Sequence, residues 1–406
     1  MNVQERDAKN DDSSSVAGYK ALLFLQLFVM KKQYYFISSF VLCLFAVMVS
    51  FCFITGKTKP VIIAYVGGFR GLVATDSIDI WRISHINYAF IDVKDNRAWL
   101  HNEATDTINL RKLSELKKQK PDLKILISVG GWSWSKNFSD AVLTDTSTRN
   151  FANSAIAIVA KFNLDGVDID WEYPGMIGDS NMFRPEDKEH YTLLFKYLRE
   201  GLDNLKKSTQ QKYFVTTAVG GSQDYIEHTE MDKVQQHTDY INIMSYDYAD
   251  GSDSVSNHHT NLYTSSADTA QYSADRSIRA FMAAGVPPQK IVIGMAFYGK
   301  GWQMETAVNN GLYAKALKPA RGGGFTYLHD SLINKNGYAR YWDTLAHAPY
   351  LFNADKKIFI SYDDEASVKD KCSYVKKYHL AGAMFWEYAS DKKEYLLKTI
   401  AGEFKY

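Results

Sequence analysis

The sequence predicts an α/β fold, a TIM (β/α)8 barrel with a small α+β insertion between strands 7 and 8. Eight short apolar runs rich in β-branched residues recur along the chain, and longer amphipathic segments such as 147–161 and 190–206 separate them. This alternation is typical of parallel strands joined by crossover helices. Polar or aromatic residues gather at the C-terminal ends of the runs, where the loops of a barrel meet.

The predicted strands span residues 61–69, 85–93, 124–132, 166–173, 213–219, 240–248, 290–299 and 382–388. More than eighty residues separate Phe297 from Gly382, whereas a crossover helix with its loops needs only about thirty. We therefore interpret residues 302–362 as an α+β insertion beside the barrel mouth. It contains the turn Gly322-Gly323-Gly324 and short strand-like runs.

The residues before the barrel are expected to form two segments. Residues 1–29 have the composition of a polar, disordered head with a short apolar segment. Lys31 and Lys32 then precede an uncharged, mostly apolar stretch of about twenty residues, long enough to cross a bilayer. Residues 30–56 are therefore either a signal peptide cleaved after Gly56 or a retained transmembrane anchor, with Met30 as an alternative start to Met1. Either outcome places residues 57–406, the barrel, outside the cell, secreted or membrane-anchored.

Composition excludes several classes of partner. Lys and Arg number 47 against 46 Asp and Glu, so no basic field attracts nucleic acid and an uncharged ligand is expected. Two of the three cysteines, Cys43 and Cys52, lie in the apolar segment, which leaves Cys372 alone in the barrel and excludes a disulfide or thiolate metal site there. We interpret the adjacent His258 and His259 as polar surface. No metal and no cofactor are expected, and a monomer is expected.

The most informative stretch is FNLDGVDIDWEYPG, residues 162–175. Its period-two alternation places Asp168, Asp170 and Glu172 on one face of a strand and apolar residues on the other. Asp165 is out of phase and is expected to be structural. Packed carboxylates are costly to ionise, so a catalytic cluster with one protonated acid is favoured. A solvated strand edge and a site for a hard metal such as Mg²⁺ are the alternatives.

The run DGVDIDWE resembles the active-site signature of family 18 glycoside hydrolases, the chitinases and their relatives. Two further runs, SVGG at 128–131 and MSYD at 244–247, match the motifs of the third and sixth strands in that family. The resemblance covers residues 60 to about 401. Within the family, the chain resembles the deep-groove subfamily, whose insertion raises one wall of the cleft. Ala64 and the pair Glu387-Tyr388 depart from the usual pattern without removing a catalytic group.

The resemblance implies a role for each acid. Glu172 is expected to donate a proton to the leaving oxygen and then to act as base, while Asp170 holds the acetamido N–H of the substrate. Asp168 shares a proton with Asp170, and the Tyr246 hydroxyl contacts the acetamido oxygen. Ser128 and Tyr65 support the buried aspartates, unless they only pack the barrel interior. The expected sugar contacts are Asp247, Met244, Trp386 and the stacking candidates Trp132, Tyr173 and Trp302.

The resemblance therefore implies a metal-independent chitinase that cleaves β-1,4 bonds between N-acetylglucosamine units with retention, through an oxazolinium intermediate made by the acetamido group of the substrate. The expected partners are chitin or its oligosaccharides, with no nucleic acid and no membrane contact beyond the N-terminal segment. Three alternatives remain: a sugar-binding lectin on a degenerate barrel, an endo-β-N-acetylglucosaminidase acting on other glycans, and a metal enzyme. Intact Glu172 argues against the lectin.

Overall fold

The computed structural model describes residues 18–20, 22–25, 27–32 and 59–406. The chain divides into two compact units, Met1–Lys59 and Pro60–Tyr406. Residues 18–20, 22–25 and 27–32 are helical, and most of the predicted head and of the signal or anchor segment lies outside the described residues. Among the residues that the structure describes, no helix has both the length and the apolar character that a membrane crossing requires.

Eight parallel strands close into a barrel in the second unit, which confirms the predicted TIM barrel. Hydrogen bonding runs in the order β1-β14-β8-β7-β6-β5-β4-β2, and β2 pairs with β1 to complete the circle. Each strand falls within one of the predicted apolar runs or overlaps it. The strands are β1 (Val61–Gly67), β2 (His85–Lys94), β4 (Lys124–Gly130), β5 (Gly166–Asp170), β6 (Phe214–Gly220), β7 (Tyr240–Met244), β8 (Ile291–Ala296) and β14 (Gly382–Trp386); β3 (Arg97–Trp99) pairs antiparallel with β2.

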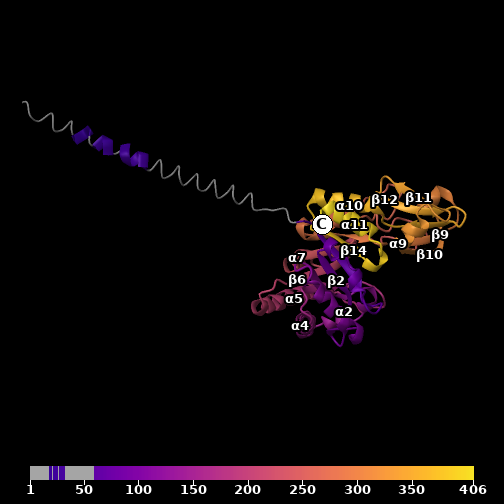
Figure 1. Cartoon of the computed structure of the whole chain (residues 1–406), viewed down its shortest axis with the longest axis horizontal. Helices are drawn as coiled ribbons and strands as arrows, with labels where there is room; N and C mark the ends of the chain where they lie inside the picture. The colour runs from indigo at the N-terminus through magenta and orange to yellow at the C-terminus, as the bar shows by residue number, and fades with distance from the viewer. Residues whose placement is uncertain (1–17, 21, 26, 33–58) are drawn as a thin grey trace, which may run out of the picture. The chain divides into compact units, whose positions relative to one another are not determined.

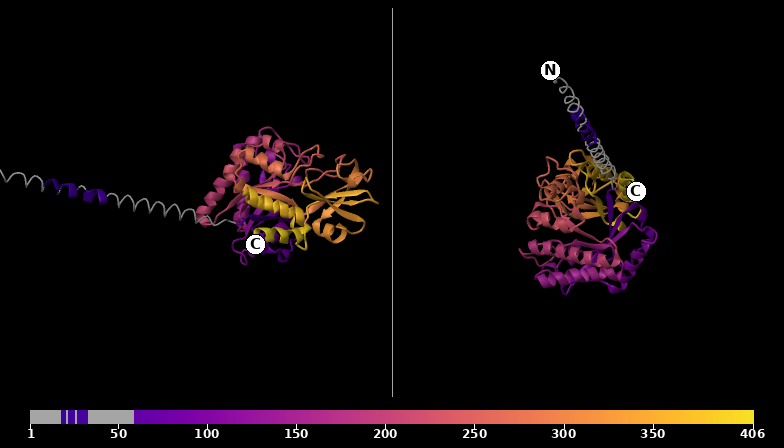
Figure 2. Two further views of the ribbon diagram at one scale, coloured as in Figure 1. Left: turned by 90° about the horizontal axis from the view of Figure 1, so that it is seen from above. Right: turned by 90° about the vertical axis from the view of Figure 1, so that its left-hand side faces the viewer.

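Helices follow the strands and pack around the outside of the barrel (Figures 1 and 2). The helix predicted from 147–161 is α4, which begins with a capping box between Thr144 and Ser147. The segment 190–206 lies within α5. The helices are α2 (Glu103–Leu116), α3 (Phe138–Ala141), α4 (Asp145–Lys161), α5 (Asp187–Thr209), α6 (Gln223–Glu227), α7 (Met231–His237), α8 (Ala274–Ala283), α9 (Phe325–Tyr327), α10 (Glu365–Tyr378) and α11 (Tyr395–Phe404).

The period-two pattern of β5 separates two environments. Val167, Ile169 and Trp171 face outward into the core between strands and helices, where the Trp171 ring stacks on Phe138 at 5.0 Å. Asp168 and Asp170 alternate with them and are also buried, at 0% and 4% exposure. Because the outward positions are filled by apolar side chains, the carboxylates are left to the barrel interior.

A second sheet lies between β8 and β14 in the chain. Its strands are all antiparallel and take the order β10-β9-β13-β12-β11; the strands are β9 (Tyr298–Met304), β10 (Ala316–Gly324), β11 (Tyr338–Asp343), β12 (Ala348–Asn353) and β13 (Ile358–Ser361). Figure 1 shows them in orange beside α10 and α11. Trp302, Phe352 and Phe359 belong to an apolar core of this sheet, distinct from the barrel core.

Candidate active site

Asp168 is the deepest acid of the site, inside the barrel. Its Oδ2 accepts hydrogen bonds from the hydroxyls of Ser128 at 2.7 Å and Tyr65 at 2.9 Å. Its Oδ1 accepts hydrogen bonds from the Thr216 hydroxyl and, at 3.3 Å, from the Asn242 amide. Burial raises the pKa of Asp168, although the hydrogen bonds from Thr216, Ser128 and Tyr65 lower it. Side chains from four other barrel strands, β1, β4, β6 and β7, therefore hold one carboxylate through hydroxyl and amide donors.

Asp170 ends β5 and lies one layer nearer to the mouth. Its backbone carbonyl accepts the Gly131 N–H at 2.7 Å, whereas its carboxyl Oδ1 is buried and has no hydrogen-bond partner among the described residues. Burial, and then the charges of Glu172 and Asp168, raise the pKa of Asp170 well above its usual range. A protonated or shared-proton carboxyl is the form that this environment favours.

Glu172 follows β5 at the barrel mouth and is half-buried. Burial raises its pKa to about 7; a hydrogen bond with Tyr173 opposes that shift, and the charge of Asp247 adds to it. Its backbone N–H donates to the Ser135 hydroxyl at 2.9 Å. A carboxyl with this pKa holds a proton at neutral or mildly acidic pH and can also accept one, as a general acid and base requires.

The acids Asp170 and Glu172 open into a cleft of about 630 Å³. Trp386, at the end of β14, lies nearly parallel to Phe90 at 5.3 Å and to Phe69 at 6.1 Å. Trp134 is tilted by 40° against both phenylalanines. Aromatic rings of this kind present large apolar faces on which a ligand can stack.

Smaller hollows adjoin the cleft on two sides. One of about 210 Å³ shares Glu172, Tyr173 and Met244 with it. Another of about 400 Å³ shares Phe69, Phe90 and Trp134. The two groups of shared residues do not overlap, so Glu172 and the aromatic cluster stand at different borders of the cleft. An elongated ligand could therefore extend past the acid in one direction and past the aromatic cluster in the other.

Tyr246 and Asp247 follow β7 and contribute to the same cleft. The Tyr246 hydroxyl contacts the Met384 sulfur at 3.7 Å. Burial would raise the pKa of Asp247, but contacts with His259, Lys300 and Tyr298 lower it to about 2. Asp247 is therefore ionised in the cleft, with 44% of its side chain exposed.

A comparison of the sequence with family models matches residues 61–391 to the model of glycosyl hydrolases family 18. The chain belongs to this family. It is 38% identical to Chitinase A1 of Niallia circulans, over 80% of this chain and 55% of that protein, so it spans about half the length of that relative. It also resembles the solved family 18 N-acetylglucosaminidase from Paenibacillus barengoltzii, with 42% identity and a TM-score of 0.79 over 85% of this chain and 100% of the other. Chitinase ChiW from Paenibacillus sp. str. FPU-7 is 37% identical with a TM-score of 0.81, over 86% of this chain and 33% of the other.

The structure of this family 18 chain brings most of the expected site residues together. Asp170, Glu172 and Tyr246 line the cleft, and the further expected residues that line it are Tyr65, Trp132, Tyr173, Met244, Asp247 and Trp386. Trp132 is 51% exposed and its ring lies 6.3 Å from that of Tyr173. Ser128 and Asp168 lie beneath, joined by their hydrogen bond. Among the described residues, no group of three or more His, Cys, Asp or Glu side chains is arranged to hold a metal ion.

Asp165 lies at the opposite end of β5 from Glu172. Its carboxylate accepts hydrogen bonds from the Ile125 N–H at 2.9 Å, the Lys117 amine at 3.1 Å and the Gln211 amide at 2.9 Å. These partners come from the elements around the base of the barrel. The position is remote from the cleft, as its phase within the motif suggested.

Two expectations are wrong. Trp302 is fully buried in the core of the second sheet, so it has no face to offer a sugar. His258 and His259 are not surface residues, because both are buried, at 1% and 0% exposure. Both errors came from judging a residue by its type and its neighbours in sequence. Burial depends instead on tertiary packing, here the packing of the second sheet.

Sequence reasoning also missed several residues of the site. Thr216 and Asn242 lie inside the apolar runs of β6 and β7, where a polar residue at an inward position was the only signal. Phe69, Phe90 and Trp134 carried no signal, because aromatic residues near strand ends are common in barrel cores. Only closure of the barrel brings them to one cleft.

Proposed function

We propose that this chain is a chitinase, which hydrolyses β-1,4 bonds between N-acetylglucosamine units. The observation that carries the proposal is the pairing of Glu172, whose pKa is raised to about 7, with the buried Asp170 beneath it in an aromatic cleft. Chitinase A1, at 38% identity, supports the substrate class. We place the activity outside the cell, secreted or membrane-anchored, and assign it to a monomer.

The proposed mechanism is retaining and substrate-assisted. Glu172 donates its proton to the glycosidic oxygen as the C–O bond breaks, while the acetamido oxygen of the substrate attacks the anomeric carbon. Asp170 accepts a hydrogen bond from the acetamido N–H, and the Tyr246 hydroxyl donates one to the acetamido oxygen. The Tyr246 contact limits the directions from which the acetamido oxygen can approach the anomeric carbon. Glu172 then removes a proton from water, which opens the oxazolinium ring from the opposite face and restores the β configuration.

The other residues have supporting roles in this proposal. Asp168, with Ser128 and Tyr65, fixes the position of Asp170 and exchanges a proton with it. Trp386 stacks beneath the sugar that carries the reacting acetamido group. The remaining sugar contacts are Trp132, Tyr173, Met244 and Asp247. Asp165 acts only in folding.

A second candidate is an N-acetylglucosaminidase that releases single sugars. It is favoured by the solved N-acetylglucosaminidase, which is 42% identical and matched over its whole length. Both candidates use the same chemistry. They differ in the number of sugar units that bind in the part of the cleft remote from Glu172. The product released first from a long oligomer therefore separates them.

The test is the product profile from N-acetylglucosamine hexamer and crystalline chitin, with and without EDTA. We expect β-configured products that EDTA does not affect, dimers for a chitinase and monomers for an N-acetylglucosaminidase. Glu172→Gln is the matched control and should lower kcat by about 10²–10⁴-fold while sugar binding remains. Hydrolysis of deacetylated oligomers at an equal rate would exclude the acetamido mechanism, and no cleavage of either acetylated substrate would exclude both candidates.

A further inference from the structure

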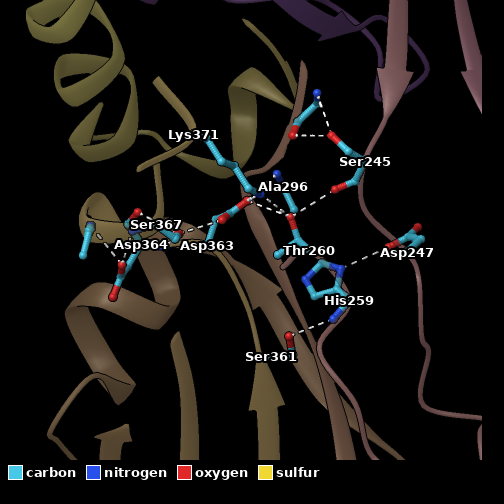
Figure 3. Close-up of polar contacts among 12 residues, drawn as sticks. Ser245, Asp247, His259, Thr260, Ala296, Ser361, Asp363, Asp364, Ser367 and Lys371 are labelled. Carbon is cyan, nitrogen blue, oxygen red and sulfur yellow. Dashed lines mark hydrogen bonds and ion pairs between the residues drawn. The ribbon is translucent and has the colours of Figure 1, made fainter. Parts of the chain in front are cut away.

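A buried ion pair links the segment after β13 of the second sheet to the end of β8 in the barrel. Lys371 on α10 and Asp363, just after β13, have fully buried side chains and their charged atoms are 2.6 Å apart. The same carboxylate accepts the Thr260 hydroxyl at 2.8 Å, the Ala296 N–H at 3.1 Å and the Ser367 hydroxyl at 2.6 Å (Figure 3). A buried ion pair is weak evidence for stability, but its many hydrogen bonds tie together the groups that surround it.

Thr260 connects this ion pair to the segment that runs beside the cleft. Its hydroxyl is 2.8 Å from Asp363 and also accepts the Lys371 amine at 2.7 Å. The preceding residue, His259, donates its backbone N–H to the Ser361 hydroxyl at 3.0 Å. Two neighbouring residues are therefore fixed by groups from β13 and α10, as Figure 3 shows.

His259 in turn holds Asp247 by two contacts. The His259 Nδ1 lies 3.3 Å from the Asp247 Oδ1, and the His259 carbonyl accepts the N–H of Tyr248, the next residue after Asp247, at 3.2 Å. Asp247 has φ +58°, in the left-handed region that side chains other than glycine rarely adopt. Such a conformation persists when surrounding contacts specify it.

We propose that Lys371, Asp363 and Thr260 form a clamp that positions His259, and through it Asp247, for the reaction in the cleft. The proposal rests on the proposed function and adds residues to it that do not touch substrate. In this proposal the second sheet does more than line the cleft, because β13 supplies Ser361, which accepts the His259 N–H, and leads into Asp363 of the clamp.

The charges around His259 agree with this arrangement. Asp247, Lys300 and Asp363 are the charged groups that act on the imidazole, and the Tyr298 ring packs at 5.3 Å. Burial lowers the pKa of His259, and its Nδ1 faces the ionised Asp247 at 3.3 Å without meeting the geometry of a hydrogen bond. Lys300 at 3.0 Å and the Tyr298 hydroxyl at 2.6 Å complete the contacts of that carboxylate.

The first test uses Thr260→Val, which removes the hydroxyl without changing the shape, and Thr260→Ser, which keeps it. The readout is the pair of ¹⁵N chemical shifts of His259 in the full chain labelled at histidine, assigned through the variant His259→Asn. We expect the Nδ1 and Nε2 shifts to move in Thr260→Val and to return toward the wild-type values in Thr260→Ser. Shifts that stay at wild-type values in Thr260→Val would overturn the proposal.

The second test is kinetic and uses Lys371→Met with Lys369→Met as its control, an exposed lysine of the same helix. Because small displacements of a substrate contact are costly, kcat/KM on the hexamer should fall about tenfold in Lys371→Met and in Thr260→Val, but not in the control. A lowered melting temperature with unchanged kcat/KM and unchanged His259 shifts would show a purely structural ion pair.

If the wild-type chain cleaves no oligomer, the proposed function fails, whereas the shifts still decide whether the clamp exists. Should Lys371→Met not fold, Thr260→Val carries both readouts.

Discussion

The proton on Glu172 links the cleft to pH. An acid must be protonated to donate, so activity should be present below the pKa of about 7 and decline as pH rises through it. The negative charge of Asp247 helps to raise this pKa. In Asp247→Asn we therefore expect the alkaline limb of the profile of kcat/KM against pH to move to lower pH, by about half a unit or more for a charge so near. A limb that stays in place or moves upward would exclude Glu172 as the titrating acid.

We expect Asp170 to lower the stability of the folded chain at neutral pH. Its pKa is raised in the folded chain by burial and by the charges of Glu172 and Asp168, so the folded state binds the proton more tightly than the unfolded state. The sign of the linkage is then fixed: stability is full below the unfolded pKa and is lost as pH rises toward the folded one. Asp170→Asn carries no charge and should raise the melting temperature at pH 7 by about 2 °C or more, with a smaller gain near pH 4. Thermal unfolding at both pH values measures this. Asp165→Asn should lose stability instead, because the Asp165 carboxylate accepts hydrogen bonds from three residues, Lys117, Ile125 and Gln211.

The residues of the site differ in how far the sequence could reveal them. Period two alone placed Asp168, Asp170 and Glu172 on one face of a strand, because alternation within one strand is a local property, whereas their expected roles came from the family resemblance. Thr216 and Asn242 do not, because the carboxylate that they serve lies on another strand. His259 was misread for the same reason, since its burial is decided by β13 and α10, which lie about a hundred residues further along the chain.

Among the structural elements, the boundary between β8 and β9 shows the limit of periodicity. The apolar run 290–299 continues through it, but β8 ends at Ala296 and β9 begins at Tyr298 in the other sheet. Phe297 stands between them, donating its N–H to the Trp386 carbonyl at 2.9 Å and accepting the Phe325 N–H at 2.8 Å. β9 opens with Tyr298 and Gly299, which continue the apolar run of β8, so hydropathy predicted all eight barrel strands without showing where the chain leaves the barrel.

The end of β4 is held close to Asp170 by a glycine. Gly130 has φ +111°, and a Cβ there would lie 2.2 Å from the Asp170 carbonyl oxygen. Gly130→Ala must therefore push β4 and β5 apart, and we expect a loss of more than about 2 kcal/mol in the free energy of unfolding together with a loss of activity. Gly71→Ala is the matched control, because Gly71 has φ +105° with open space around it; it tests the backbone strain alone, about 1–2 kcal/mol. Chemical denaturation of both variants measures the difference, and equal losses would show that the contact with Asp170 is unimportant.

At the scale of the whole molecule, the candidate site and the clamp lie entirely in the unit Pro60–Tyr406. That unit contains the closed barrel, the second sheet and their two apolar cores, so the fragment 57–406 should fold without the residues before it. We expect its melting temperature to match that of the full chain and its kcat/KM on the soluble hexamer to agree within about twofold, because a small soluble substrate meets only the cleft. Glu172→Gln in the fragment controls for background hydrolysis. A fragment that folds but loses activity on the hexamer would mean that residues before Pro60 contribute to the site, whereas a loss confined to crystalline chitin would assign them to contact with the polymer surface.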